Sequence, residues 1–448
     1  MGTSDLKFSG SPVKGLIGAT VGFFFGSAAV SLFGPTAHHF KTVMDLSPTM
    51  VGLMVAIPSL SGSILRIPFG ASVDTNGGKK PFLILMVLSV LGLCGLIGLV
   101  SHPEMITHSS YWLFILCGLF AGCGIATFSV GTSQISYWYP QARQGTALAT
   151  YAGIGTLAPG IFALILPYLV KLGWVDAYVA WTIFLSVGTI LYWWLGKNAP
   201  YFQFLDRGMD DARAKAAALQ SGEDLFPKGN IMESLSTSAK VPATWILVSL
   251  YFATFGGFLA LTSWYPTIWR AEYGFDVTKA GIFTAGFSIL SAALRVVAGP
   301  WSDKIGGRRL CMISMFMLAI GGLGVMFLHG LLWTVVFTVV IAAAMGFNNA
   351  AVFKLVPSYV PQAIGGASGW VGGIGAFSGF LLPTLMGWFV SVGGQSWYLL
   401  GFIVFVVMAV INILLIYFFL DHGKMRREAD MVAARKSQTA RPTETVSK

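Results

Sequence analysis

The sequence predicts an all-α membrane protein with twelve transmembrane helices arranged as two six-helix halves. Hydrophobic residues make up 55% of the 448 positions and charged residues only 10%, whereas soluble domains carry about 25% charged residues. Apolar runs of roughly 20 residues, long enough to cross a bilayer as helices, recur along the whole chain. These runs are continuous rather than alternating, which favours helices over a barrel, the other structure that satisfies its backbone in lipid.

One polar segment divides the expected spans into two groups of six. This segment, 197–241, is rich in charged residues. We therefore expect an N-terminal half over 1–196, a cytoplasmic linker over 197–241, a C-terminal half over 242–422 and a cytoplasmic tail over 423–448. The expected spans are 13–37, 49–72, 81–100, 111–136, 144–170, 177–195, 243–269, 278–302, 309–329, 332–356, 366–391 and 398–420.

The distribution of lysine and arginine predicts the orientation of the chain. With the N-terminus inside, 21 of the 28 basic residues fall on the cytoplasmic side and four on the outer side, as the positive-inside rule requires. We expect a multi-pass monomer in the lipid bilayer of the cytoplasmic (inner) membrane, with both termini cytoplasmic. The net charge of +10 then reflects topology and does not indicate a nucleic-acid partner.

A motif that follows the second span returns after the eighth. One copy runs from Arg66 to Lys80 and the other from Arg295 to Arg309, with an arginine, a glycine, an aspartate, a glycine pair and a basic pair at the same spacing. Two further matches occur in the same order in both halves, one of them joining Pro140 to Pro361. Such matches indicate parallel repeats related by an axis along the membrane normal.

These repeated residues resemble the loop after the second and eighth helices of the major facilitator superfamily. The resemblance implies the major facilitator fold, in which two halves rock about a central site. A carboxylate at each helix end can pair with basic residues after a tight glycine turn. We therefore expect a conformational latch formed by Gly70, Asp74, Gly299, Asp303 and Arg308.

Two arginines are expected at mid-membrane depth. Arg66 lies eight residues before Asp74, or about 12 Å along a helix, near the middle of a hydrocarbon core about 30 Å thick. The repeat gives Arg295 the same depth, and none of the 18 acidic residues lies deep in a span. A charge there costs roughly 2.5–3.5 kcal/mol unless it is compensated. Water, dipoles, aromatic faces or a bound anion remain as partners, and two guanidinium forks suit a planar oxyanion.

A third cation, Lys354, also falls within an expected span. Its counterpart under the repeat is Ser133, so it breaks the symmetry. It either snorkels to the interface, forms a third anion contact, or acts in a proton-linked site, because a buried lysine shifts its pKa readily.

The fifth and eleventh spans contain matching glycine-rich motifs. Small residues of this kind let helices pack closely and slide. Together with an arginine in the second and eighth spans, these motifs resemble the nitrate/nitrite porter family, as do the segments from Leu250 to Phe258 and from Gly346 to Pro357. The motif residues are Gly153, Gly155, Thr156, Gly373 and Gly375.

The resemblance implies a site for nitrate or nitrite. It implies that Arg66 and Arg295 clamp the anion, that Tyr251 donates a hydrogen bond near it, and that Phe25 and Phe255 wall the site. One difference concerns the asparagine that the family commonly has after the second glycine: Thr156 and Ala376 stand in those places here.

The function expected is secondary transport by alternating access. We expect proton-coupled nitrate uptake, with nitrate/nitrite exchange as the alternative, since exchange needs no protonatable group in the membrane. Transport of another small anion such as an organic carboxylate is also open. The sequence has no nucleotide-binding loop, catalytic triad or metal-ligand cluster, so we expect no enzyme activity, no metal and no cofactor.

Overall fold

Twelve helical spans confirm the predicted all-α membrane fold. The computed structural model describes residues 8–223, 226, 231–360 and 364–420, and its regular structure is helical throughout those residues. The spans that are long and apolar enough to cross a membrane are Pro12–Ser31, Pro48–Val73, Lys79–Val100, His108–Trp138, Ala147–Leu172, Trp174–Leu195, Pro242–Tyr273, Val277–Ser302, Gly307–Phe327, Leu331–Val356, Gly366–Gly393 and Trp397–Phe419.

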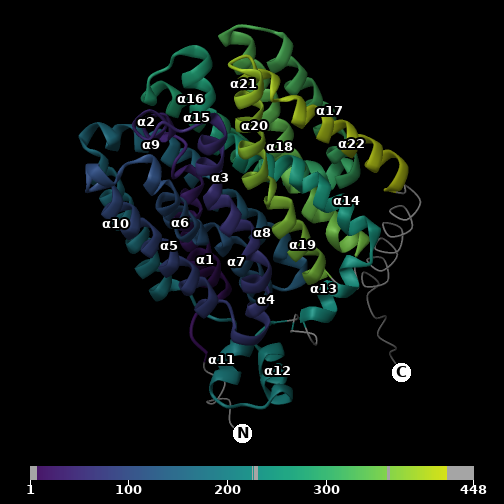
Figure 1. Cartoon of the computed structure of the whole chain (residues 1–448). Helices are drawn as coiled ribbons and strands as arrows, with labels where there is room; N and C mark the ends of the chain where they lie inside the picture. The colour runs from purple at the N-terminus through teal and green to yellow at the C-terminus, as the bar shows by residue number, and fades with distance from the viewer. Residues whose placement is uncertain (1–7, 224–225, 227–230, 361–363, 421–448) are drawn as a thin grey trace, which may run out of the picture.

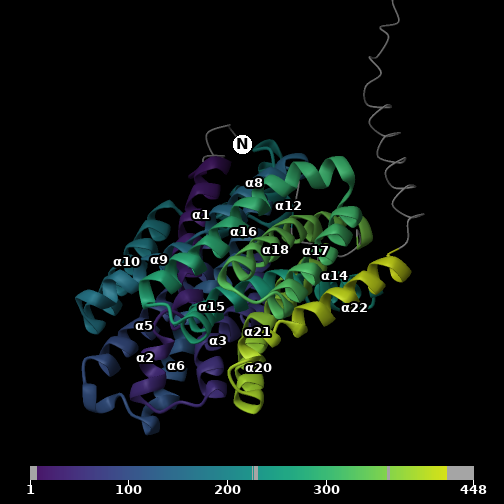
Figure 2. The same ribbon diagram turned by 90° about the horizontal axis from the view of Figure 1, so that it is seen from above.

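The two halves lie side by side. Figure 1 shows α5, α6 and α10 of the N-terminal half (α1–α10, Pro12–Leu195) on the left and α14, α17 and α22 of the C-terminal half (α14–α22, Pro242–Phe419) on the right, with α15 and α16 of the C-terminal half beside α2 and α9. Figure 2, turned by 90°, separates α5 and α10 from α17 and α22 in the same way. We call the end that carries the linker helices α11 (Pro200–Asp206) and α12 (Asp211–Gln220) the linker end, and the opposite end the far end.

Several spans are interrupted near the middle of the molecule. The second span breaks at Leu65 into α3 (Pro48–Ile64) and α4 (Arg66–Asn76). The seventh contains a π-helical turn, Phe252–Gly256, between α14 (Pro242–Tyr251) and α15 (Gly257–Tyr273). Such local departures from α-helical pairing frequently occur at functional sites.

The glycine motifs mark two further breaks. In the fifth span, α8 (Gln141–Gly155) ends at the motif and α9 (Ala158–Leu172) follows. In the eleventh, α19 (Ile364–Ala376) ends there and α20 (Ser378–Gly393) follows. The eighth span, in contrast, is the continuous helix α16 (Val277–Ile305).

The halves contact each other closely at the far end. A Cβ atom at Gly52 of α3 would lie only 2.4 Å from the Pro383 carbonyl oxygen of α20, and one at Gly387 only 2.5 Å from that of Pro48. Beside them, the hydroxyl groups of Thr49 and Ser391 are 2.8 Å apart and share a hydrogen bond. Glycine therefore permits backbone-to-backbone packing that closes this end.

The linker is helical and is divided between the halves. On the N-terminal side, Gln203 of α11 exchanges hydrogen bonds with the backbone of Ser9. On the C-terminal side, Trp370 of α19 donates to the carbonyl of Leu235 in α13 (Ile231–Ala239). Thus α11 docks on the N-terminal half, α12 packs on α11, and α13 docks on the C-terminal half. The predicted tail, 423–448, lies outside the described residues.

Candidate functional site

Arg66 and Arg295 converge on the same two phenyl rings at the interface between the halves. The Arg66 Cζ atom lies 4.8 Å from the ring centroid of Phe128 and 5.1 Å from that of Phe255. The corresponding distances for Arg295 are 5.9 Å and 5.5 Å. Phe128 belongs to α7 (Thr127–Trp138) of one half and Phe255 to the π-helical turn of the other. Cation–π contacts therefore stabilise both charges and connect the two halves.

The arginines keep several donors free of protein partners. Arg66 donates from Nη1 to the Gly372 carbonyl at 3.0 Å, and Arg295 donates from Nη2 to the Tyr251 hydroxyl at 3.4 Å. Among the described residues, Nε and Nη2 of Arg66 and Nη1 of Arg295 are buried without a hydrogen-bond partner. Buried polar groups are usually paired, so these atoms are available for a ligand that accepts hydrogen bonds.

Neither arginine has a carboxylate partner within the described part of the chain, where the ion pairs recorded lie in the linker. Arg66 and Arg295 are only 1% and 7% exposed. Two buried positive charges without a counter-ion are costly, and an anion between them removes that cost.

A narrow cavity adjoins Arg295. It is too tight to hold a water molecule, and it is lined by residues of both halves: Thr156, Phe255, Phe258, Ser291, Ala292, Arg295 and Asn349. Thr156, at the place where the family commonly has asparagine, reaches this cavity, but its hydroxyl donates to the Ala152 carbonyl of its own helix. A ligand beside Arg295 therefore requires these side chains to move apart.

The first glycine of each motif contacts the half opposite its own. A Cβ atom at Gly153 would lie 2.4 Å from the side chain of Val296, the residue after Arg295. A Cβ atom at Gly373 would lie 2.7 Å from the side chain of Ile67, the residue after Arg66. These glycines therefore allow the helix that carries each arginine to approach the opposite half.

The second glycine of each motif makes room for an aromatic ring of its own half. A Cβ atom at Gly155 would lie 2.0 Å from the Phe23 ring, and one at Gly375 would lie 2.8 Å from the Tyr251 ring. Tyr251 in turn stacks on Phe255 at 4.7 Å. The glycine motif of the eleventh span thus determines where the hydroxyl beside Arg295 lies.

Phe25, which was predicted to line the site, packs elsewhere. Its ring stacks on Phe184 of α10 at 4.1 Å instead of facing the arginines. Phe23, two residues earlier and so about 200° around the helix, lies 5.3 Å from Phe128. Phe255 lies beside both arginines, and its role in lining an anion site stays a prediction.

The sequence analysis did not identify Phe128 as a site residue, although the repeat pairs it with another residue near the arginines. The spacing that pairs Ser133 with Lys354 also pairs Phe128 with Asn349, and Asn349 lines the cavity. Nothing else in the sequence distinguishes Phe128 among the 34 phenylalanines.

Lys354 contacts the helix that carries Arg295 nearer the linker end. Its Nζ atom donates to the Ser302 carbonyl at 2.8 Å, and Ser302 is seven residues, or about 10 Å, beyond Arg295 along α16. A role for Lys354 in anion binding or proton coupling stays a prediction.

The predicted latch is described only in part. Gly77 and Gly306, the turn glycines after the two aspartates, have φ of 66° and 89°, a conformation that favours glycine. Gly70 packs near Ser129, whereas Gly299 has open space around it. Arg308 donates from Nη2 to the Ile416 carbonyl of α22 (Ile403–Phe419) at 3.0 Å. The side chains of Asp74 and Asp303 lie outside the described residues, so their pairing stays a prediction.

This geometry defines a class of protein: a multi-pass membrane transporter with two repeated halves around a central, positively charged site. The match to the family model of the Major Facilitator Superfamily covers residues 19–283 and 247–443, and the chain belongs to that family. The fold is similar to the xylose transporter XylE from E. coli in a partially occluded inward open conformation, with a TM-score of 0.70, 16% identity and coverage of 92% of this chain and 98% of that one.

Relatives of known name confirm the resemblance to nitrate and nitrite porters. A "Probable nitrate transporter NarT" of Staphylococcus epidermidis is 27% identical over 88% of this chain and 94% of its own length. The "Nitrite extrusion protein" of Bacillus subtilis is 26% identical over 86% and 89%. A "Probable nitrate/nitrite antiporter NarK2" of Thermus thermophilus is 27% identical over 82% and 83%.

Proposed function

We propose that this protein carries nitrate, and also nitrite, across the cytoplasmic membrane by alternating access, with Arg66 and Arg295 as the anion clamp. The observation that carries the proposal is the set of buried guanidinium donors without protein partners on both arginines. Nitrate is a planar monoanion with three acceptor oxygens, which matches the two forks. The names of the relatives support the same substrates.

The remaining site residues have supporting roles in this proposal. Phe128 and Phe255 hold both guanidinium groups, and Tyr251 orients Arg295. With the linker end facing the cytoplasm, as the basic residues indicate, the closed far end faces outward, and the helix breaks supply points at which the linker end opens.

Nitrate-dependent thermal stabilisation of the purified protein tests the clamp. We expect nitrate to stabilise the wild-type protein and to have little effect on Arg66→Ala or Arg295→Ala. Competition separates the substrates: nitrate should displace labelled nitrate in counterflow, and oxalate and formate should not. Displacement by oxalate but not by nitrate would replace the proposed substrate with an organic carboxylate.

For energy coupling, we propose proton-coupled nitrate uptake, with Lys354 as a candidate proton-linked group. Nitrate/nitrite exchange is the second candidate, which the antiporter name of a relative supports. Proteoliposomes distinguish the two. Uptake that follows an imposed pH gradient without internal nitrite supports symport, whereas uptake that ignores the gradient and requires internal nitrite supports exchange.

A further inference from the structure

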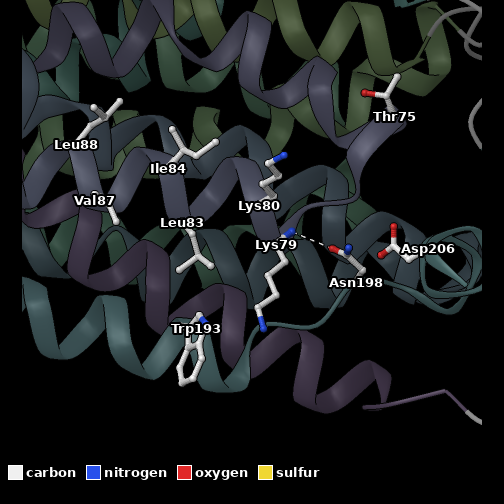
Figure 3. A pocket seen from close by; sticks show the side chains of 10 residues that line it. All are labelled: Thr75, Lys79, Lys80, Leu83, Ile84, Val87, Leu88, Trp193, Asn198 and Asp206. Carbon is white, nitrogen blue, oxygen red and sulfur yellow. Dashed lines mark hydrogen bonds between the residues drawn. The ribbon is translucent and has the colours of Figure 1, made fainter.

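A groove of about 650 Å³ lies at the linker end of the N-terminal half, away from the arginines. Figure 3 shows it where α5 (Lys79–Val100) meets the end of α10 (Trp174–Leu195). Its volume falls in the range of small-molecule sites. It is lined by Thr75, Lys79, Lys80, Leu83, Ile84, Val87, Leu88, Trp193, Asn198 and Asp206.

The groove is apolar along its length and charged at one end. Ile84, Val87 and Trp193 are 41%, 48% and 62% exposed, and as parts of spans they face lipid. Lys79 and Lys80 begin α5, so their ammonium groups lie at the membrane surface. Val87, eight residues after Lys79, is about 12 Å deeper along the helix axis. The arrangement matches an acyl chain below a headgroup.

The charged end is positive overall. Lys197 is close enough to interact electrostatically with Lys79, whereas the lining contains one carboxylate, Asp206. Neither Lys79 nor Lys80 takes part in an ion pair with a described side chain. In Figure 3 the two lysine side chains diverge: Lys79 runs toward Trp193 and Lys80 runs in the opposite direction. Both have long rotatable stems that can turn toward a phosphate at the groove mouth.

Trp193 marks the depth of the membrane boundary. Its ring lies 6.0 Å from the Lys79 ammonium, and tryptophan is enriched at the level of lipid headgroups. Basic pockets between transmembrane helices on the cytoplasmic side recognise anionic headgroups. We infer that this groove binds an anionic phospholipid, with its phosphate at Lys79 and Lys80 and one acyl chain along Leu83 and Val87.

Lipid bound in this groove affects the stability of the turn between α4 and α5. The Lys79 backbone N–H donates to the Asn198 side chain at 2.9 Å, and a Cβ atom at Gly77 would lie 2.5 Å from that same side chain. A lipid that holds Lys79 therefore stabilises the turn that follows the helix of Arg66. We expect the bound lipid to raise the melting temperature of the protein.

The test uses the purified full chain with phosphatidylglycerol, phosphatidylethanolamine or phosphatidylcholine, and counts bound lipids by native mass spectrometry. We expect the wild-type protein to retain phosphatidylglycerol several-fold better than the other two lipids. Lys79→Gln/Lys80→Gln should lose one bound phosphatidylglycerol and its thermal stabilisation, and Lys79→Arg/Lys80→Arg should keep both. The control Lys240→Gln/Lys304→Gln removes the same charge from exposed positions at the linker end and should behave as wild type.

Three outcomes would overturn the inference. Unchanged phosphatidylglycerol occupancy in the Gln double variant would place the lipid elsewhere. Equal retention of phosphatidylethanolamine would show that negative charge does not select the ligand. Equal stabilisation by glycerol 3-phosphate would show that the apolar groove contributes nothing. Correct folding of the Gln variant is verified by its nitrate-dependent stabilisation, which depends on other residues.

Discussion

Arg66 and Arg295 occupy equivalent positions in the two repeats but make different contacts. Arg66 begins α4 directly after a helix break, and its hydrogen bond crosses to Gly372 in the opposite half. Arg295 lies within the unbroken α16 and bonds to Tyr251 of its own half. Separation of the halves at the linker end therefore breaks the hydrogen bond of Arg66 and preserves that of Arg295. A repeat can thus give two arginines the same depth while the hydrogen bond of one crosses the interface and that of the other stays within its own half.

The largest expected effect comes from removing either arginine. Truncating one partner of a buried hydrogen-bonded charge pair costs roughly 2–5 kcal/mol, so Arg66→Ala and Arg295→Ala should each weaken nitrate binding by at least ~30-fold. Arg66→Lys should be more damaging than Arg295→Lys, because lysine lacks the planar fork with which Arg66 donates to Gly372 across the interface while Nε and Nη2 stay unpaired. Nitrate titrations followed by thermal shift measure both differences.

Lys171→Ala, at the far end, serves as the control for loss of positive charge. Equal losses in the two lysine variants would contradict the asymmetry between the arginines. Wild-type nitrate binding in either alanine variant would contradict the clamp itself.

A second comparison uses two glycines of α19 that differ in the space around them. A Cβ atom at Gly375 would lie 2.8 Å from the Tyr251 ring, whereas one at Gly372 would lie 3.7 Å from Ser129. Overpacking costs about 1–3 kcal/mol, so Gly375→Ala should reduce nitrate transport by roughly tenfold. Gly372→Ala, the matched control, should transport at close to the wild-type rate. Uptake in proteoliposomes measures both, and equal effects would show that Tyr251 placement is unimportant.

A smaller effect is expected from removing the Tyr251 hydroxyl, which contacts Arg295. Tyr251→Phe removes the long 3.4 Å bond to Arg295, and a bond of this kind contributes about 0.5–1.5 kcal/mol. We expect nitrate affinity to fall by about 2- to 10-fold in counterflow. When Gly26 in the first span is aligned with Gly257 in the seventh, Thr20 takes the place of Tyr251. Thr20 bonds to its own helix at Leu16, so Thr20→Val should leave affinity unchanged. If Thr20→Val lowered nitrate affinity as much as Tyr251→Phe, the Tyr251 hydroxyl would have no special role beside Arg295.

The smallest effect on transport, but a clear one on the linker, is expected at Glu223. Burial raises the pKa of this carboxyl from 4.5 to about 8, although it accepts a hydrogen bond from the Tyr201 backbone. Between those pH values the folded linker binds more protons than the unfolded linker, so stability falls as pH rises. Glu223→Gln keeps the acceptor and should abolish this fall.

Limited proteolysis between pH 6 and pH 8.5 measures this prediction. Protection of α11, which docks on the N-terminal half, and of α12, which packs on α11, should decrease with pH in the wild-type protein and stay constant in the variant. Protection of α13, on the C-terminal half, serves as the internal control. The prediction fails if the wild-type and variant profiles coincide.

The fold was largely predictable because short stretches of sequence, read one at a time, specify its helices. Continuous apolar runs specify helices in lipid, and the match between Arg66 to Lys80 and Arg295 to Arg309 specifies two repeats. The site was predictable in part. Arg66 and Arg295 are charged residues in apolar runs, so they stand out. Phe128 is one of many phenylalanines, and only its neighbours show that it contacts both arginines.

The sequence by itself determined the class of protein, the twelve spans, the depth of the two arginines and the scarcity of acidic residues around them. The tertiary structure decided which side chains complete the site. Phe25 turns toward α10 while Phe23 faces Phe128, since helical rotation and the packing of neighbouring spans select one face. It also decided that Arg66 reaches across to Gly372 and Arg295 does not. Repeated sequence specifies equivalent backbone positions, but contacts between two different halves depend on side chains that the repeat does not share.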